Sequence, residues 1–152
     1  LVLPQRARDA QATTAWAGDV AEMIARVRFT PEAYGEMFAV GTAEHMTWGE
    51  IADIYKELIG LEAVWVDMED FLAILTHNSN NPMGVRYQLI YDRLFDRIMD
   101  NSKILEVTGM KQSELTTLYD GLKRELAGVN ADTFVEMKNS PIMDQYLKER
   151  GL

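Results

Sequence analysis

A helix signal at residues 47–60 constrains the fold more than any other part of the sequence. Thr47 and Glu50 are spaced as in a capping box, in which a hydroxyl and a carboxylate three residues later bind the free amides of a helix start. Apolar residues then recur at helical spacing up to Gly60, a residue type that commonly ends helices. The sequence therefore predicts an amphipathic α-helix with defined ends.

Short apolar runs flank this helix on both sides. Residues 37–40 (Met-Phe-Ala-Val) indicate a buried strand that stops at Gly41, and a polar turn then leads to Thr47. Residues 63–66 (Ala-Val-Trp-Val) indicate a second strand, and Asp67 is placed to cap the helix that follows.

The rest of the chain is mostly helical by the same criteria. In chain order the predictions are a strand at residues 1–3, a helix capped by Asp19, one turn at Pro31, a loop at 77–82, a helix at 85–95, a strand at 97–99, a two-turn helix ending at Gly109, a helix at 117–128, and helices starting at Asn130 and Ser140. The fold class predicted is α+β, a mostly helical lobe with a few short strands.

Composition limits the class of protein. A chain of 152 residues is long enough for one domain, and no apolar run approaches the ~20 residues of a membrane span. A net charge of -9 disfavours nucleic acid as a partner, and the lack of cysteine excludes disulfides and thiolate sites. We expect a cytoplasmic protein with no membrane partner. The chain starts at Leu1 without methionine, so we expect a piece of a longer protein.

Motifs for catalysis or metal binding are weak. The two histidines, His45 and His77, fall in predicted turns far apart in sequence, so we predict no metal site. Tyr119 and Lys123 have the Y-x-x-x-K spacing of short-chain dehydrogenases, in which an ammonium lowers the pKa of a phenol. The pair opens a short helix late in the chain with no glycine-rich cofactor loop before it. We therefore predict no catalytic residue in this chain.

Five segments, taken in order, give a resemblance to a known family. They are residues 16–21 (WAGDVA), 35–41 (GEMFAVG), 46–52 (MTWGEIA), 100–104 (DNSKI) and 121–124 (GLKR). They resemble the "hVdDvA", "GevfNvG", "vTwrEia", "DnSKi" and "EGlrrt" segments of the extended short-chain dehydrogenase/reductase superfamily, the NAD-dependent sugar epimerases and dehydratases. Their order and spacing resemble the C-terminal, substrate-binding part of that family, over about residues 12–128.

The resemblance implies that the family's dinucleotide loop and catalytic Tyr and Lys belong to an N-terminal Rossmann part that is missing here. It therefore implies no cofactor in this chain, NAD or NADP in the parent protein, and Tyr119 and Lys123 outside the family's catalytic positions. The fold implied is the C-terminal portion of a Rossmann-type epimerase without its dinucleotide-binding half. Residues 1–128 would form the substrate lobe, and residues 129–152 would be added helices packing on the same domain.

Substrate-binding residues are implied by the same resemblance. The family substrate is a nucleotide sugar or a similar small molecule, whose phosphates often meet two basic residues. Arg93 is the nearest match to one of them, Arg86 and Arg97 are neighbours that could serve instead, and each of these arginines could simply solvate a helix face. Where the other basic residue is expected, the sequence has Gln11-Ala12-Thr13. Trp16, which opens the first segment, is a further predicted substrate-binding residue.

Two functions are therefore expected from the sequence. The first is a substrate-binding fragment of an NAD(P)-dependent epimerase/dehydratase-like oxidoreductase that is not catalytic by itself. The alternative is a free-standing helical adaptor that forms a homodimer through the exposed edge of the strand at residues 37–40, because unpaired strand edges favour association.

Overall fold

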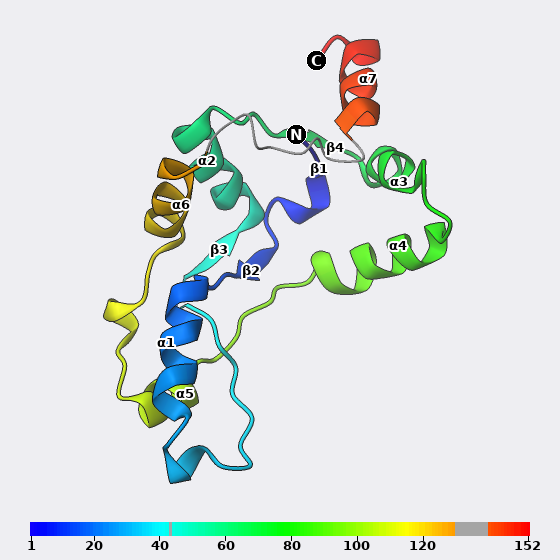
Figure 1. Cartoon of the computed structure of the whole chain (residues 1–152). Helices are drawn as coiled ribbons and strands as arrows, with labels where there is room; N and C mark the ends of the chain where they lie inside the picture. Colours follow the sequence, from blue (N-terminus) through cyan, green and yellow to red (C-terminus); the bar gives the residue numbers. More distant parts are fainter. Residues whose placement is uncertain (43, 130–139) are drawn as a thin grey trace. The chain divides into compact units, whose positions relative to one another are not determined.

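A computed structural model describes residues 1–42, 44–129 and 140–152 (Figure 1). Its α-helices in these ranges are α1 (Ala17–Val27), α2 (Trp48–Ile59), α3 (Met68–Thr76), α4 (Pro82–Gln88), α5 (Ser102–Thr108), α6 (Leu118–Ala127) and α7 (Ser140–Arg150). Its strands are β1 (Val2–Pro4), β2 (Gln11–Thr13), β3 (His45–Thr47) and β4 (Val64–Val66). The predicted class, α+β and mostly helical with a few short strands, is confirmed.

The chain forms two compact units. Unit 1 contains Leu1–Ala10, Thr47–Asp96 and Val129–Leu152, and unit 2 contains Gln11–Met46 and Arg97–Gly128. Each unit is therefore assembled from segments that are far apart in sequence. The division into a lobe at residues 1–128 and added helices at 129–152 stays a prediction.

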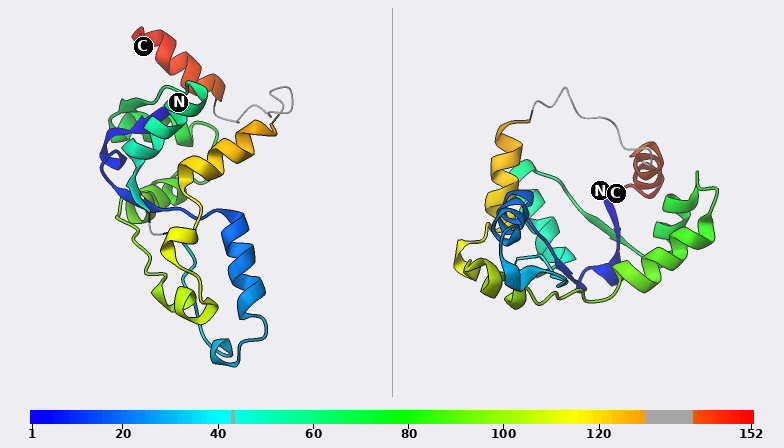
Figure 2. Two further views of the ribbon diagram at one scale, coloured as in Figure 1. Left: turned by 90° about the vertical axis from the view of Figure 1, so that its left-hand side faces the viewer. Right: turned by 60° about the horizontal axis from the view of Figure 1, so that its bottom comes forward.

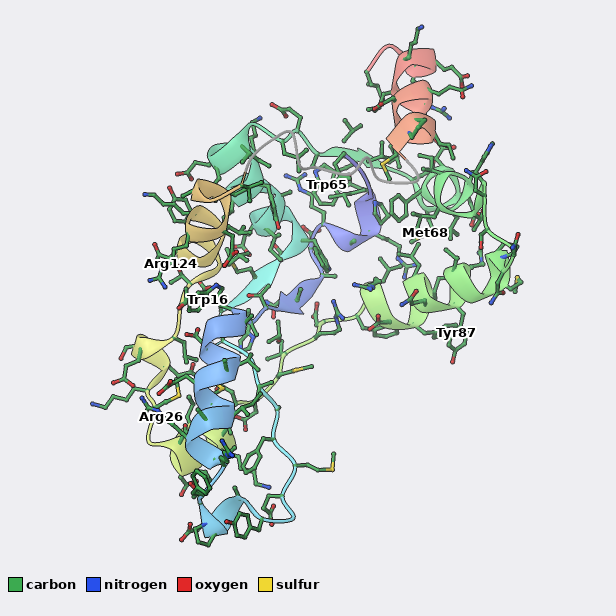
Figure 3. All side chains as sticks on the ribbon, in the orientation of Figure 1. Trp16, Arg26, Trp65, Met68, Tyr87 and Arg124 are labelled. Atoms are coloured by element: carbon green, nitrogen blue, oxygen red, sulfur yellow. The ribbon has the colours of Figure 1, made fainter. Side chains whose placement is uncertain are left out.

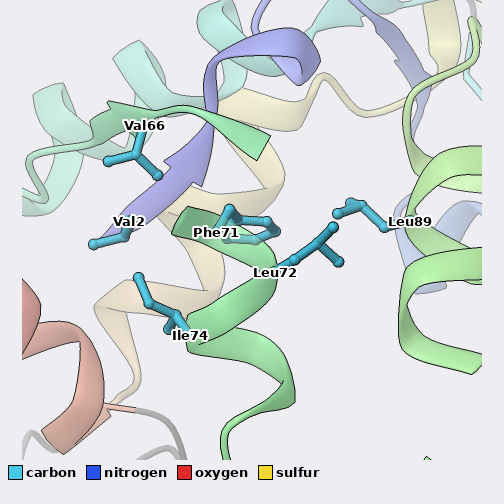
Figure 4. Packing of buried hydrophobic residues seen from close by; sticks show 6 residues of the cluster. All are labelled: Val2, Val66, Phe71, Leu72, Ile74 and Leu89. Carbon is cyan, nitrogen blue, oxygen red and sulfur yellow. The ribbon is translucent and has the colours of Figure 1, made fainter. Parts of the chain in front are cut away.

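Unit 1 is built on a parallel pair of strands, β1 and β4, with Val2 opposite Val64, Leu3 opposite Trp65 and Pro4 opposite Val66. Val2 and Val66 of this pair pack with the buried residues Phe71, Leu72, Ile74 and Leu89 (Figure 4). Helix α7 adds the partly buried side chains Ile142, Met143, Tyr146 and Leu147 to this core.

The predicted capping box of α2 is present. The amide of Glu50 donates to Thr47 Oγ1 at 3.2 Å, and the amide of Thr47 donates to Glu50 Oε2 at 2.8 Å. The hydrogen bonds that the Thr47 amide and hydroxyl donate to the Glu50 carboxylate hold the pKa of this carboxyl below its usual value. Gly60 ends the helix at a φ of 71°, a left-handed conformation that glycine adopts without a steric cost.

The predicted cap of α3 is present. The helix predicted at 85–95 is also present, but its start and the form of its second half differ from the prediction. Asp67 Oδ1 accepts the amides of Glu69 and Asp70 at 2.9 and 3.0 Å, as predicted. Helix α4 starts three residues earlier than predicted, at Pro82. It continues as a π-helical turn, η3 (Leu89–Arg93), in which hydrogen bonds skip one more residue than in an α-helix.

Unit 2 contains the two-stranded β2–β3 sheet and helices α1 and α5, which lie side by side (Figure 2). Its buried core is Met23, Ile104, Leu105, Met110 and Leu115. The predicted stop of α5 at Gly109 is found at a φ of 67°. The helix predicted at 117–128 is α6, and Thr117 caps it by accepting the amide of Asp120 at 3.0 Å.

The prediction that Asp19 caps α1 is wrong. The N-cap position belongs to Trp16, and Asp19 is the third residue of the helix, in its first turn. Its buried carboxylate instead accepts two hydrogen bonds from Thr116, from the amide at 2.7 Å and from the hydroxyl at 3.1 Å. Asp19 is therefore bound to a residue 97 positions away in sequence and does not act as the helix cap.

The strand predicted at residues 37–40 is also wrong, and the strand in this region is β3, which lies inside the predicted turn. Phe38 and Val40 pack on the core of unit 2, while Met37 is 90% exposed, so side chains alternate as in a strand. The backbone bonds to side chains instead of to a neighbouring strand. Lys103 Nζ donates to the carbonyl of Met37 at 3.3 Å, and Asn101 Nδ2 donates to the carbonyl of Gly41 at 2.7 Å.

The strand predicted at residues 97–99 is likewise not a strand. Three hydrogen bonds hold the segment against β2. The amide of Arg97 donates to the carbonyl of Gln11 at 2.9 Å, and the Thr13 hydroxyl donates to the carbonyl of Arg97. The amide of Met99 donates to Thr13 Oγ1 at 3.1 Å. Two of the three bonds use a side chain, so no ladder forms. The helix predicted to start at Asn130 lies outside the described residues.

The cap of α2 can be tested by replacing Thr47 with alanine. Thr47→Ala removes the acceptor for the amide of Glu50, and we expect the free energy of unfolding to fall by about 1 kcal/mol. Urea denaturation followed by far-ultraviolet circular dichroism measures this loss. The exposed Ser113→Ala is the control, and an equal loss in both variants would contradict the capping role of Thr47.

The contact between Asp19 and Thr116 can be tested in the same way. Asp19→Ala leaves the amide of Thr116 without its charged acceptor, so we expect unfolding to become easier by about 2 kcal/mol. The exposed Asp9→Ala removes the same charge without that contact and should leave the urea midpoint nearly unchanged. A small effect of Asp19→Ala would show that the bond is not important for stability.

Candidate functional site

Unit 1 contains a cavity of about 310 Å³ beside its strand pair. The residues that line it are Leu3, Pro4, Ala7, Trp48, Trp65, Phe71, Leu75, Val85, Gln88, Leu89 and Arg93. Nine of these eleven are apolar, and only Gln88 and Arg93 carry polar side chains. An apolar cavity with a few polar groups is the usual form of a small-molecule site.

The indole rings of the cavity are positioned by backbone contacts. Trp65 lies on β4 opposite Leu3, so both residues of this register pair line the cavity. Trp48 starts α2, and its amide donates to the carbonyl of Ala10 at 3.1 Å. The next residue, Gly49, donates to the carbonyl of Arg8 at 2.9 Å, and a Cβ at Gly49 would lie 3.2 Å from that oxygen. The glycine therefore lets the start of α2 approach this backbone closely.

Arg93 supplies the only charge among the described residues that line the cavity. It lies on η3, and its Nε pairs with Asp92 Oδ2 at 3.3 Å. Gln88 and Arg93 are exposed, whereas Phe71 and Leu89 are buried, so the polar groups lie at the rim and the apolar groups at the base. A ligand would therefore place its apolar part inward and its polar or anionic part at the rim.

The predicted site residues are not brought together. Arg93 lines the cavity, whereas Arg86 pairs with Glu69 at 3.2 Å outside it. Trp16 belongs to unit 2, where its Nε1 donates to Glu125 at 3.4 Å and the guanidinium of Arg124 lies 5.2 Å from its ring (Figure 3). Trp16 lines a smaller cavity of about 130 Å³ in that unit.

Sequence reasoning missed Trp48 and Trp65 as site residues. Their signal was present, because Trp48 starts a predicted helix and Trp65 lies in a predicted strand just before the cap of the next helix. What the sequence did not show is the pairing of β1 with β4, which brings Leu3 and Pro4 to the same wall.

Other polar clusters of unit 1 are internally satisfied. The hydroxyl of Tyr146 donates to Asp70 Oδ2 at 2.6 Å, and Arg150 pairs with the same oxygen at 2.9 Å. The hydrogen bond to the Asp70 carboxylate raises the pKa of Tyr146. This network joins α7 to α3, and we assign it a structural role.

His45 lies in β3 and His77 lies just after α3. Within the described ranges, no group of three or more histidine, aspartate or glutamate side chains is arranged to hold a metal ion. None of the helices in these ranges is long and apolar enough to cross a membrane.

The starts of helices α2 and α3 do not suit the pyrophosphate of a dinucleotide. Helices α2 and α3 follow strands β3 and β4, and a pyrophosphate would need the free amides at such a helix start. The carboxylates of Glu50 and Asp67 already accept amides there. Their negative charge would also repel phosphate at these positions.

Comparison with known proteins gives no relative, since no protein-family model, curated protein or solved structure matches the chain.

Proposed function

We propose that the chain is the substrate-binding part of an NAD(P)-dependent epimerase/dehydratase-like oxidoreductase, and that the cavity of unit 1 holds its small-molecule substrate. The observation that carries the proposal is Arg93, the arginine nearest to the family's phosphate-binding position, at the rim of a cavity walled by Trp48 and Trp65. The five sequence segments supply the family. The resemblance implies a nucleotide sugar or a similar small molecule as the substrate.

Catalysis belongs to the parent protein in this proposal. Tyr119 and Lys123 lie on α6 in unit 2, with Lys123 Nζ 5.9 Å from the Tyr119 ring centroid. Neither residue lines a cavity described above. With the helix starts of α2 and α3 taken by carboxylates, NAD or NADP would bind to the Rossmann part of the parent. The lack of cysteine and the net charge of -9 support a cytoplasmic protein that does not bind nucleic acid.

The proposal can be tested by titrating the isotope-labelled chain and following its indole N–H signals by nuclear magnetic resonance. The ligands are UDP-glucose, 4-phenylbutanoate, 4-phenylbutanamide and NAD. We expect at least one of the first three to shift the signals of Trp48 and Trp65 saturably while the signal of Trp16 stays unchanged. We expect no saturable shift with NAD, because the amides at the starts of α2 and α3 are bound by carboxylates and the resemblance assigns the dinucleotide loop to the parent's Rossmann part.

A variant that fills the cavity is the control for the location of binding. Val85 lines the cavity from α4, so Val85→Trp should abolish the shifts. Met83→Trp places the same side chain on an exposed part of α4 and should leave binding intact. Proof of correct folding comes from the unchanged far-ultraviolet spectra of both variants. If none of the first three ligands binds, or if NAD binds tightly, the proposed function is wrong.

A second candidate function is association into a homo-oligomer. The strand edge predicted for it is missing, because residues 37–40 form no strand, but α4 and the segment after it expose a different apolar stripe. Met83, Tyr87, Tyr91 and Phe95 recur every four residues and are 57–72% exposed, and Figure 3 shows Tyr87 projecting outward from α4. The rings of Tyr87 and Tyr91 lie 4.7 Å apart. Exposed apolar patches of this kind often mark interaction surfaces.

Light scattering distinguishes this alternative. Association through the stripe predicts a molar mass that rises above that of one chain with concentration. The double variant Tyr87→Glu/Tyr91→Glu, which places two charges in the stripe, should restore the mass of a single chain. A single-chain mass at every concentration of the unmodified protein contradicts the alternative.

A further inference from the structure

We propose that the cavity of unit 1 selects a largely apolar, aromatic ligand that carries one carboxylate, in preference to a nucleotide diphosphate. This inference rests on the proposed function and narrows its substrate class. It comes from the composition, charge and size of the cavity, and it departs from the nucleotide sugar that the sequence resemblance implies.

The composition of the wall favours an aromatic ligand body. Trp48, Trp65 and Phe71 contribute three aromatic side chains to the cavity, together with aliphatic ones. The hydroxyls of a sugar and the edge of a nucleobase would lose hydrogen bonds to water there, and among uncharged side chains only Gln88 and the indole N–H donors of Trp48 and Trp65 could replace them. An aromatic ring buries apolar surface and pairs favourably with the indoles.

The charge of the rim fits one anionic group. Arg93 is the single cation on the described lining, and its ion pair within the described residues engages Nε. The two terminal nitrogens of a guanidinium match the two oxygens of a carboxylate. Arg86 is engaged by Glu69, and the guanidinium of Arg8 lies 6.0 Å from the Trp65 ring without lining the cavity. A pyrophosphate would thus meet one cation in a chain whose net charge is -9.

The π-helical turn explains how one helix presents both parts of the site. Leu89, which opens η3, is buried at the base of the cavity, and Arg93, which ends it, lies at the rim. Such turns recur at functional sites because they change which side chains face inward. The volume, about 310 Å³, is at the lower end of the range for ligand pockets, roughly 300–1,000 Å³, and suits a small ligand.

Isothermal titration calorimetry of the full chain tests the inference with three probes. They are 4-phenylbutanoate, its neutral amide 4-phenylbutanamide, and UDP-glucose. We expect the carboxylate to bind about tenfold more tightly than the amide, and UDP-glucose to bind more weakly than either. Arg93→Gln should weaken binding of the carboxylate about tenfold and leave binding of the amide unchanged. Arg86→Gln removes a cation from the same helical segment outside the cavity and should change neither.

The outcomes separate this inference from the proposed function. Tighter binding of UDP-glucose than of the carboxylate, lost in Val85→Trp, would overturn the inference and leave the proposed function standing. Equal affinity for carboxylate and amide would also overturn it, because Arg93 would then contribute nothing to recognition. Absence of binding by all three probes would contradict both. Loss of amide binding in Arg93→Gln would show a structural role for Arg93 and would overturn its assignment to the anion.

Discussion

The parallel pairing of β1 with β4 is the constraint on which unit 1 depends. It joins residues 2–4 to residues 64–66, and its register decides which side chains face the core and which face the cavity. Val2 and Val66 enter the buried cluster, whereas the pair Leu3 and Trp65 lines the cavity. A slip by one residue would exchange the two faces, since side chains alternate along a strand. Core and candidate site therefore both depend on this register, and Phe71 and Leu89 belong to both.

Local signals predicted helix ends well because their partners are near in sequence. Thr47 with Glu50 and Asp67 with the first turn of α3 form bonds across two or three residues, and Gly60 needs only its own left-handed backbone. The predictions that failed concern residues whose hydrogen-bond partners are far away in sequence. Asp19 has the residue type of a cap, but its carboxylate is bound by Thr116 in the folded chain. The apolar alternation of residues 37–40 was real, yet alternation cannot show whether a neighbouring strand exists.

The candidate site was predictable only in part for the same reason. The sequence resemblance pointed to Arg93, but it could not show that the other candidate, Arg86, forms an ion pair with Glu69, 17 residues earlier, and does not line the cavity. The walls include residues of β1, α2, β4, α3, α4 and η3, and convergence of so many elements is a property of topology. Apolar periodicity also did not predict the π-helical form of η3, which sets which residues of this segment face the cavity.

The residues that carry the resemblance have a structural explanation. In unit 2, Asp19 of the segment at residues 16–21 binds Thr116, which lies shortly before the segment at 121–124. Asn101 and Lys103, in the segment at 100–104, bind carbonyls of the segment at 35–41. Such residues hold segments together, so a chain can retain them while its ligand changes. Motifs of this kind therefore indicate how the scaffold is held together, whereas the side chains of the cavity determine which ligand it can bind. Its walls, with Trp48 and Trp65 around a single rim arginine, favour an aromatic anion over a diphosphate even if the scaffold derives from a sugar-nucleotide enzyme.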